Sequence, residues 1–271
     1  LSSPYLASQN LSLKIEYREP VLITKELLDF LVQRETNDFE KNHLGHNDEV
    51  DKTAHEILEK KIQATKLNGY ATSQPFGKYA RRLEAHTFIS ITPSILRAEI
   101  NEFLISRFHS NEVEFHSTFF CLFHQVRDII KKENYILVRV GEEVTDAGLV
   151  TGGILIDIVS LPTGKNSFIR QIAEGLYTLP DEVYSFMGRA SSDIMDVKMK
   201  LEIDKKIALA EDKWRESFSS GVKRFLEESF MPETCVLSVD QKVSDYFKNG
   251  LQANGYKVTV LSDFPSLSYN I

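Results

Sequence analysis

The stretch ILVRVGEEVTDAGLVTGG, residues 136–153, decides the fold class of this chain. It holds a strand-like run that stops at Gly141, a second such run, and the tight-turn signal Thr151–Gly153, so it predicts a strand followed by a hairpin. A glycine between two strands lets backbone amides approach a phosphate, and the hydroxyl of Thr145 can donate to the same phosphate. On the residues alone, an ordinary structural hairpin explains the pattern better than a phosphate site does.

The segments on either side of this stretch alternate between helix and strand patterns. Residues 83–91 alternate between the two faces of a strand, and residues 22–35 show one apolar helical face. Residues 181–230 carry a long apolar helical stripe in which Trp214 and Phe218 are predicted core residues. The tail reads as strand, helix, strand, which predicts a parallel pair with a right-handed crossover. The alternation places the chain in the α/β or α+β class.

Composition excludes several functions. The formal net charge is -7, with 32 basic and 39 acidic residues interspersed, so nucleic acid is not expected as a partner. No basic patch or long apolar run is visible, so we expect membrane contact only indirectly or through a segment outside this sequence. Cys121 and Cys235 lie far apart in apolar runs, which fits a reducing cytoplasm. The histidines predict no metal site, and no catalytic residue stands out.

Residues 138–153 resemble the second phosphate-binding hairpin of the actin-like ATPases, where the pattern is Asp, apolar, Gly, small, any, Thr, Thr, Asp. Gly141 stands at the family glycine, Thr145 at the second threonine and Asp146 at the following acidic residue. The resemblance implies that these residues lie beside the phosphates of ATP. It also implies an actin-like (ribonuclease H-like) α/β fold with an inserted small α+β subdomain.

Four departures from that family pattern bear on ATP. Arg139 stands where the family has an aspartate that serves the magnesium-water network, Glu142 replaces the small residue, and Val144 replaces the first threonine. A carboxylate beside a phosphate is repelled unless a metal intervenes. The family's glycine-rich adenosine loop corresponds to residues 239–242, which contain no glycine. These departures predict that ATP and Mg binding is weak or lost.

Other segments resemble the bacterial FtsA and PilM families within this superfamily. Asn68–Tyr70, Pro75–Gly77 and Arg82–His86 are similar to the inserted subdomain of FtsA. Ser160–Asn166 is similar to the FtsA and PilM segment in which Pro-x-Gly opens a helix. The helical pattern of residues 181–230, in place of strands, is closer to PilM.

The resemblance implies a division of the chain into parts. Residues 1–17 are expected to be a remnant of the first actin lobe, and residues 18–116 an inserted FtsA-type interaction subdomain. Residues 117–134 are expected to be a helix of the first lobe. Residues 135–271 are expected to be the second actin-like lobe, with a helical insertion at 181–230.

The implied function is that of an actin-like scaffold in bacterial cell division or envelope-machine assembly. It would self-associate and bind other division or envelope proteins, in the cytoplasm or peripherally at the inner membrane. The alternative is an active ATPase, or a small-molecule kinase of the same superfamily, that binds Mg-ATP between two lobes. We do not expect an efficient ATPase. The cofactor is expected to be either ATP with Mg or none. The candidate cofactor-binding residues are Gly141, Glu142, Glu143, Thr145, Asp146, Asp240 and Gln241.

Overall fold

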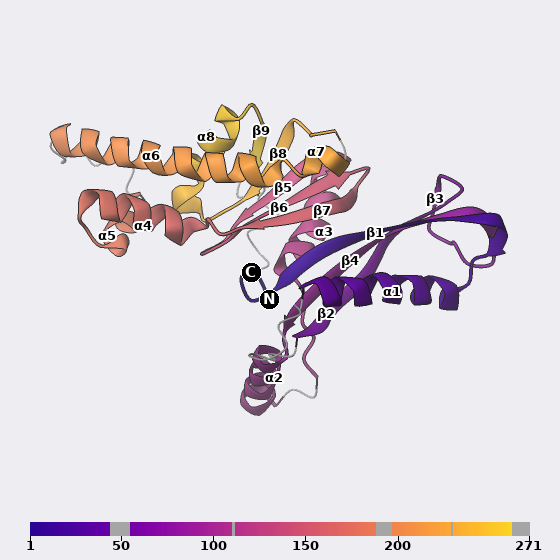
Figure 1. Cartoon of the computed structure of the whole chain (residues 1–271). Helices are drawn as coiled ribbons and strands as arrows, with labels where there is room; N and C mark the ends of the chain where they lie inside the picture. Colours follow the sequence, from indigo (N-terminus) through magenta and orange to yellow (C-terminus); the bar gives the residue numbers. More distant parts are fainter. Residues whose placement is uncertain (44–54, 110–111, 188–196, 229, 262–271) are drawn as a thin grey trace. The chain divides into compact units, whose positions relative to one another are not determined.

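The computed structural model describes residues 1–43, 55–109, 112–187, 197–228 and 230–261 (Figure 1). The chain divides into two compact units, each with its own sheet. Unit 1 comprises Leu1–Ile130 with Ile154–Ile156, and unit 2 comprises Lys131–Gly153 with Asp157–Ile271. The candidate cofactor-binding residues all belong to unit 2.

Unit 1 is built on an antiparallel sheet in the order β1-β4-β2-β3. The strands are β1 (Ala7–Leu22), β2 (His55–Leu67), β3 (Tyr70–Thr72) and β4 (Tyr79–Pro93). The alternation seen at residues 83–91 is confirmed as part of β4. The predicted boundary between residues 17 and 18 falls inside β1, an edge strand whose register shifts between Glu16 and Val21, around Pro20. A proline is tolerated there because an edge strand has unpaired backbone groups.

The described residues of unit 1 form three helices: α1 (Lys25–His43), α2 (Ser94–Phe108) and α3 (Thr118–Ile130). The helix predicted at 22–35 is confirmed as α1, and Thr24 Oγ1 accepts the Leu27 amide at 3.2 Å as its cap. Leu28, Leu31 and Val32 of α1 pack into one apolar cluster with residues of β1 and β4. Phe120 of α3 stacks on Phe88 of β4 with ring centroids 4.0 Å apart. Burial of these apolar faces stabilises both helices.

Unit 2 is built on a mixed sheet in the order β7-β6-β5-β8-β9. The strands are β5 (Tyr135–Val140), β6 (Thr145–Thr151), β7 (Ile154–Leu161), β8 (Thr234–Ser238) and β9 (Lys257–Val260). The predicted hairpin is confirmed as β6 and β7, with Gly152 and Gly153 at positive φ in its turn. β5 pairs antiparallel with β6 and parallel with β8, and β8 pairs parallel with β9. The predicted strand-helix-strand tail is therefore confirmed.

The helices of unit 2 follow the predicted pattern. They are α4 (Lys165–Leu176), α5 (Pro180–Met187), α6 (Val197–Val222), α7 (Phe225–Glu228) and α8 (Ser244–Ala253), with a short 3-10 helix η1 (Gln241–Val243). Trp214 and Phe218 of α6 are buried and stack at 5.3 Å, so their interpretation as core residues is confirmed. Residues 188–196 and 229 of the predicted helical insertion lie outside the described residues.

Candidate functional site

The loop between β5 and β6 holds most of the candidate residues. Val140 and Thr145 are the last cross-strand pair, and the Gly141 amide donates to the Val144 carbonyl at 2.9 Å. The loop is therefore a tight turn whose glycine lies beside the guanidinium of Arg139. A Cβ added at Gly141 would stand 3.0 Å from Nη1 of that arginine.

The first turn of α4 is bonded to the carbonyls of this loop. A free helix N-terminus is an anion site because its first amides lack partners within the helix. Here three consecutive amides donate to the loop, with Gly164 bonded to Glu143 at 3.0 Å, Lys165 to Gly141 at 2.8 Å and Asn166 to Glu142 at 2.7 Å. A Cβ at Gly164 would lie 2.5 Å from the Glu142 carbonyl oxygen, so only glycine allows this approach. These three amides therefore bind the protein itself.

The hydroxyl of Thr145 is also engaged within the fold. Thr145 is fully buried, and its Oγ1 donates to the Thr163 carbonyl at 2.6 Å. The same oxygen accepts a hydrogen bond from Trp214 Nε1 at 3.2 Å. A hydroxyl has one proton to donate, and this one is committed to Thr163. Thr145 therefore serves the packing of α6 on the sheet.

Arg139 and Asp146 face each other across β5 and β6. Nη1 of Arg139 lies 3.5 Å from Oδ2 of Asp146, which is buried. Ser160 Oγ donates to the other carboxylate oxygen at 2.6 Å. Asp146 is thus neutralised by the arginine that stands at the family's magnesium-serving position. A guanidinium carries no acceptor for a metal-bound water.

A five-residue polar cluster joins the loop, α4, α5 and the segment after β8; we call it the Lys165 cluster, made up of Glu142, Lys165, Tyr184, Asp240 and Lys242. Lys165 Nζ lies 2.9 Å from Glu142 Oε1 and 3.0 Å from Asp240 Oδ2. Tyr184 OH donates to the same Oδ2 at 2.6 Å, and the Lys242 amide donates to Oδ1 at 3.0 Å. The ammonium groups of Lys165 and Lys242 lie 5.1 and 4.4 Å from the centroid of the Tyr184 ring.

Protonation in this cluster follows from its contacts. Burial works against the charge of Lys165, but hydrogen bonds and charges from Glu142 and Asp240 outweigh it and raise the pKa of Lys165. Burial likewise works against the Asp240 charge, yet hydrogen bonds from Tyr184, Lys242 and Lys165 lower its pKa. The hydrogen bond to Asp240 raises the pKa of Tyr184. All three groups therefore keep their usual charge state at neutral pH.

Glu143 and Gln241 complete the set of candidate residues. Arg170 of α4 holds the Glu143 carboxylate through contacts of 2.8 and 3.1 Å, and Asn166 Nδ2 donates to it at 2.9 Å. These hydrogen bonds lower the pKa of Glu143 to about 2. Gln241 opens η1, and its carbonyl accepts the Ser244 hydroxyl at 3.0 Å.

A cavity of about 390 Å³ opens beside the Lys165 cluster. Its lining includes Lys165, Asn166, Arg170, Asp181 and Tyr184. The cavity lining, the Lys165 cluster and the Arg170–Glu143 pair together hold three basic side chains (Lys165, Arg170, Lys242) and four acidic ones (Glu142, Glu143, Asp181, Asp240). The sum is one net negative charge, which disfavours a triphosphate.

Several groups that could bind the phosphates of Mg-ATP are engaged within the protein. The amides of Gly164, Lys165 and Asn166 donate to loop carbonyls, and the Lys165 ammonium contacts two carboxylates. Among the described residues, no group of three or more His, Cys, Asp or Glu side chains is placed to hold a metal ion.

Sequence reasoning missed Tyr184 as a site residue. Nothing in its local pattern separates it from other tyrosines of amphipathic helices, because its partner Asp240 lies 56 residues away. Lys165 follows Gly164 directly, and that glycine was a usable signal of close backbone approach. Asp240 was one of the predicted candidate residues. In the structure Lys165 contacts both Asp240 and Glu142 and so links the two carboxylates.

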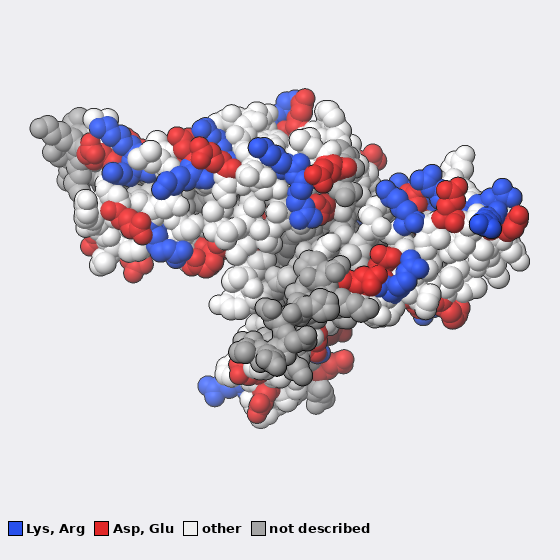
Figure 2. Space-filling model, viewed as in Figure 1, with Lys and Arg blue, Asp and Glu red and all other residues white. Residues whose placement is uncertain are grey.

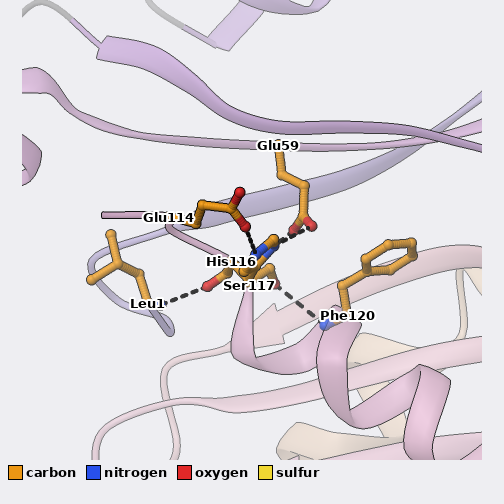
Figure 3. A network of polar contacts seen from close by, with 6 residues as sticks. All are labelled: Leu1, Glu59, Glu114, His116, Ser117 and Phe120. Atoms are coloured by element: carbon orange, nitrogen blue, oxygen red, sulfur yellow. Dashed lines mark hydrogen bonds and ion pairs between the residues drawn. The ribbon is translucent and has the colours of Figure 1, made fainter. Parts of the chain in front are cut away.

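A second polar network lies in unit 1, where Glu59 anchors the start of α3 (Figure 3). Glu59 sits at a register shift of β2 and is buried. Its carboxylate contacts His116 Nδ1 at 3.0 Å and accepts the Ser117 amide at 3.1 Å. Ser117 Oγ in turn accepts the Phe120 amide at 3.4 Å, as a helix cap does. A buried carboxylate is tolerated here because a histidine and an amide share its charge.

Comparison with known proteins identifies the fold. No protein-family model matches the chain, and no curated protein gives a significant match to it. A chain from the PilM-PilN type IV pilus biogenesis complex is similar in structure, with a TM-score of 0.52 and 11% identity. The match covers 96% of this chain and 70% of that one. This likeness shows the fold alone, and it confirms the predicted actin-like α/β class.

Two further structures match less well. A protein from Bacteroides thetaiotaomicron VPI-5482 with actin-like ATPase fold and unknown function has a TM-score of 0.39 at 12% identity, covering 97% of this chain and 66% of that one. The ethanolamine utilization protein EutJ from Carboxydothermus hydrogenoformans has a TM-score of 0.35 at 17% identity, covering 50% of this chain and 46% of that one. The chain therefore spans less than two thirds of each of these two proteins.

Proposed function

We propose that this protein is an actin-like scaffold of bacterial cell division or envelope-machine assembly, which self-associates, binds partner proteins, and has weak or lost ATP binding. The observation that carries the proposal is that the Lys165 ammonium forms ion pairs with both Glu142 and Asp240. The cation best placed to meet a phosphate is already neutralised by two carboxylates. A triphosphate would have to displace both of them and then face their repulsion.

Partner binding is supported by the surface of α2. None of its fifteen described residues is buried, and four large apolar side chains are exposed on it: Ile95, Phe103, Ile105 and Phe108. Exposed aromatic and large apolar side chains are enriched at protein–protein contacts. The PilM-PilN structure is itself a complex of two proteins. We place the partners among division or envelope proteins, with α2 as part of the contact surface.

Nucleic acid and direct membrane insertion are not part of this proposal. Figure 2 shows Lys and Arg interspersed with Asp and Glu over the visible described surface, without a broad basic field. None of the helices in the described ranges combines the length and apolar character that crossing a bilayer requires. We place the protein in the cytoplasm, with attachment at the inner membrane occurring through its partners.

The test is calorimetry of the full-length protein with Mg-ATP, beside the variant Arg139→Asp. We expect no binding at micromolar concentration for the wild type, and no measurable turnover for either protein. Sedimentation of the same samples checks self-association, which should not depend on added nucleotide. Micromolar ATP binding with turnover by the wild type would instead support the alternative, a working ATPase of the same fold.

A further inference from the structure

The long strand β1 lies at the edge of the unit 1 sheet. It has sixteen residues, and among the described strands only β4 pairs with it. Its other edge therefore presents backbone amides and carbonyls to which a further strand can bond. Pro20 and the register shift between Glu16 and Val21 interrupt the second half of the strand. A further strand would therefore be centred on the residues ahead of Pro20.

Charged residues on one face of this sheet alternate in sign from strand to strand. Lys66 of β2 lies opposite Glu84 of β4, and Glu84 lies opposite Lys14 of β1. Arg82 of β4 likewise lies opposite Glu16 of β1. Opposite charges that face each other across two strands stabilise a sheet. Both rows end at β1, where Lys14 and Glu16 are exposed and form no ion pair with a described residue.

The other face carries an apolar row in the same register. Leu67 of β2 lies opposite Leu83 of β4, which lies opposite Ile15 of β1. Leu67 and Leu83 are buried, whereas Ile15 at the end of the row is only partly buried. An apolar side chain placed beside Ile15 would remove this remaining surface from water. The edge therefore fits a strand that brings a carboxylate to Lys14, an apolar side chain to Ile15 and a cation to Glu16.

A second β1 in antiparallel orientation meets all three requirements. When the Ile15 residues of two copies lie opposite each other, Lys14 of each copy lies opposite Glu16 of the other. The signs then continue to alternate across both sheets. Moving the centre by one residue would place Lys14 opposite Lys14 or Glu16 opposite Glu16, and like charges directly opposite each other are destabilising. The charges on this edge therefore select one register.

We propose that β1 is a self-association surface, to which a second copy of this chain adds its own β1 in antiparallel orientation with the two Ile15 residues at the centre. This contact rests on the proposed function, because it specifies how the scaffold self-associates. The contact is twofold symmetric and uses the same residues on both copies, so it closes at a dimer. The sheets of the two copies join into one continuous sheet.

The test is sedimentation velocity of the full-length protein over a concentration series, with the variants Lys14→Glu and Glu16→Lys. Each substitution converts both opposite-charge pairs of the dimer into like-charge pairs, so dimerisation should weaken by about tenfold or more. Lys61→Glu is the matched control. It makes the same change of charge at an exposed lysine of β2 and should leave dimerisation unchanged.

An equimolar mixture of the two variants separates charge pairing from loss of the fold. One copy then carries glutamate at positions 14 and 16, and the other carries lysine at both. Opposite charges face each other again, but only in the mixed dimer. We expect the mixture to dimerise about as tightly as the wild type. Variants that had lost their fold would not be rescued by mixing.

The outcomes distinguish this contact from the proposed function. Dimers that both variants weaken and the mixture restores support the contact. Equal self-association of the wild type and both variants, or a mixture no tighter than the variants alone, overturns the contact and leaves the scaffold proposal in place. A wild type that stays monomeric throughout overturns both the contact and the proposed self-association, and leaves the edge to a segment of a partner protein.

Hydrogen exchange locates the contact on the chain. Amide exchange in β1 should slow by severalfold as the protein concentration passes the midpoint of dimerisation, because the amides of the free edge gain partners. Exchange in α2 should not change, since that helix takes no part in the contact. Dimers in which β1 exchanges as fast as in the monomer would overturn the proposal.

Discussion

The indole Nε1 of Trp214 donates a 3.2 Å hydrogen bond to Oγ1 of Thr145, and that oxygen donates onward to the Thr163 carbonyl. This chain of bonds ties the long helix α6 to the edge of the β5–β6 loop. The threonine that matches a phosphate ligand of the actin-like family thus performs a structural task here. The packing of Trp214 against Phe247, with ring centroids 4.9 Å apart, continues the same contact into α8.

Thr145→Val should therefore lower the free energy of unfolding by about 1–3 kcal/mol, because it leaves a buried indole N–H and a carbonyl without their partner. Thr145→Ser keeps the hydroxyl and should lower the free energy of unfolding by less than Thr145→Val does. Urea unfolding followed by Trp214 fluorescence measures both variants. A Thr145→Val protein as stable as the wild type would contradict this role.

Gly164→Ala should destabilise unit 2 or shift the β5–β6 loop, since the new methyl group would overlap backbone atoms of Glu142 and Glu143 at 2.5 Å. Gly175→Ala in the same helix is the control. There the nearest atom is the flexible Lys206 side chain at 2.8 Å, which can move, and alanine favours a helix over glycine by about 1 kcal/mol. Thermal unfolding should rank the control at or above wild type and Gly164→Ala well below it.

The Glu59–His116 contact should make stability depend on pH. The hydrogen bond to Glu59 leads the causes that raise the pKa of His116 above 6.5. A raised pKa means that the folded state binds the proton more tightly, so the contribution is fully present below pH 6.5 and is lost as pH rises through the folded value. In wild type, the free energy of unfolding should fall as the pH rises above 6.5. His116→Gln should make this fall smaller. An unchanged pH profile in the variant would rule the contact out as its source.

Arg224 and Asp157 form a two-point contact, with Nε and Nη2 at 2.7 and 2.6 Å from the carboxylate oxygens. Asp157 is buried in β7, so removal of its partner leaves a buried charge uncompensated. Arg224→Ala should cost about 2 kcal/mol in urea unfolding, as expected for hydrogen bonds to a charged group. Arg224→Lys should recover part of this, because it restores the charge without the paired geometry. Equal losses for both variants would show that the geometry, not the charge, matters.

Some of the fold could be predicted because local pattern and tertiary structure agree. The β6–β7 hairpin has two glycines at positive φ, and only a turn requires them. The stripe containing Trp214 and Phe218 has helical period and is buried as expected. β1 was not predicted because its start is polar and carries no alternating pattern, although Leu11, Leu13 and Ile15 alternate with polar residues ahead of the register shift between Glu16 and Val21.

The site was predicted as a set of positions, but its contacts were not. Glu142 and Asp240 are nearly a hundred residues apart, and Lys165 brings them together by bonding to both. The ion-pair partner of a charged residue cannot be predicted from the sequence, because pairing depends on distances in the folded chain. The bonds that neutralise Lys165 could not be read from its neighbours.

The sequence by itself determined the α/β class, the hairpin and the substitution of Arg139 for a family aspartate, because turn chemistry and periodicity are local properties. Tertiary structure decided that Thr145 is bonded to Trp214, that the first amides of α4 are bonded to loop carbonyls, and that the Tyr184 ring contacts two lysines. These arrangements depend on which donor meets which acceptor across long sequence separations, and only the packing of the helices on the sheet sets those distances.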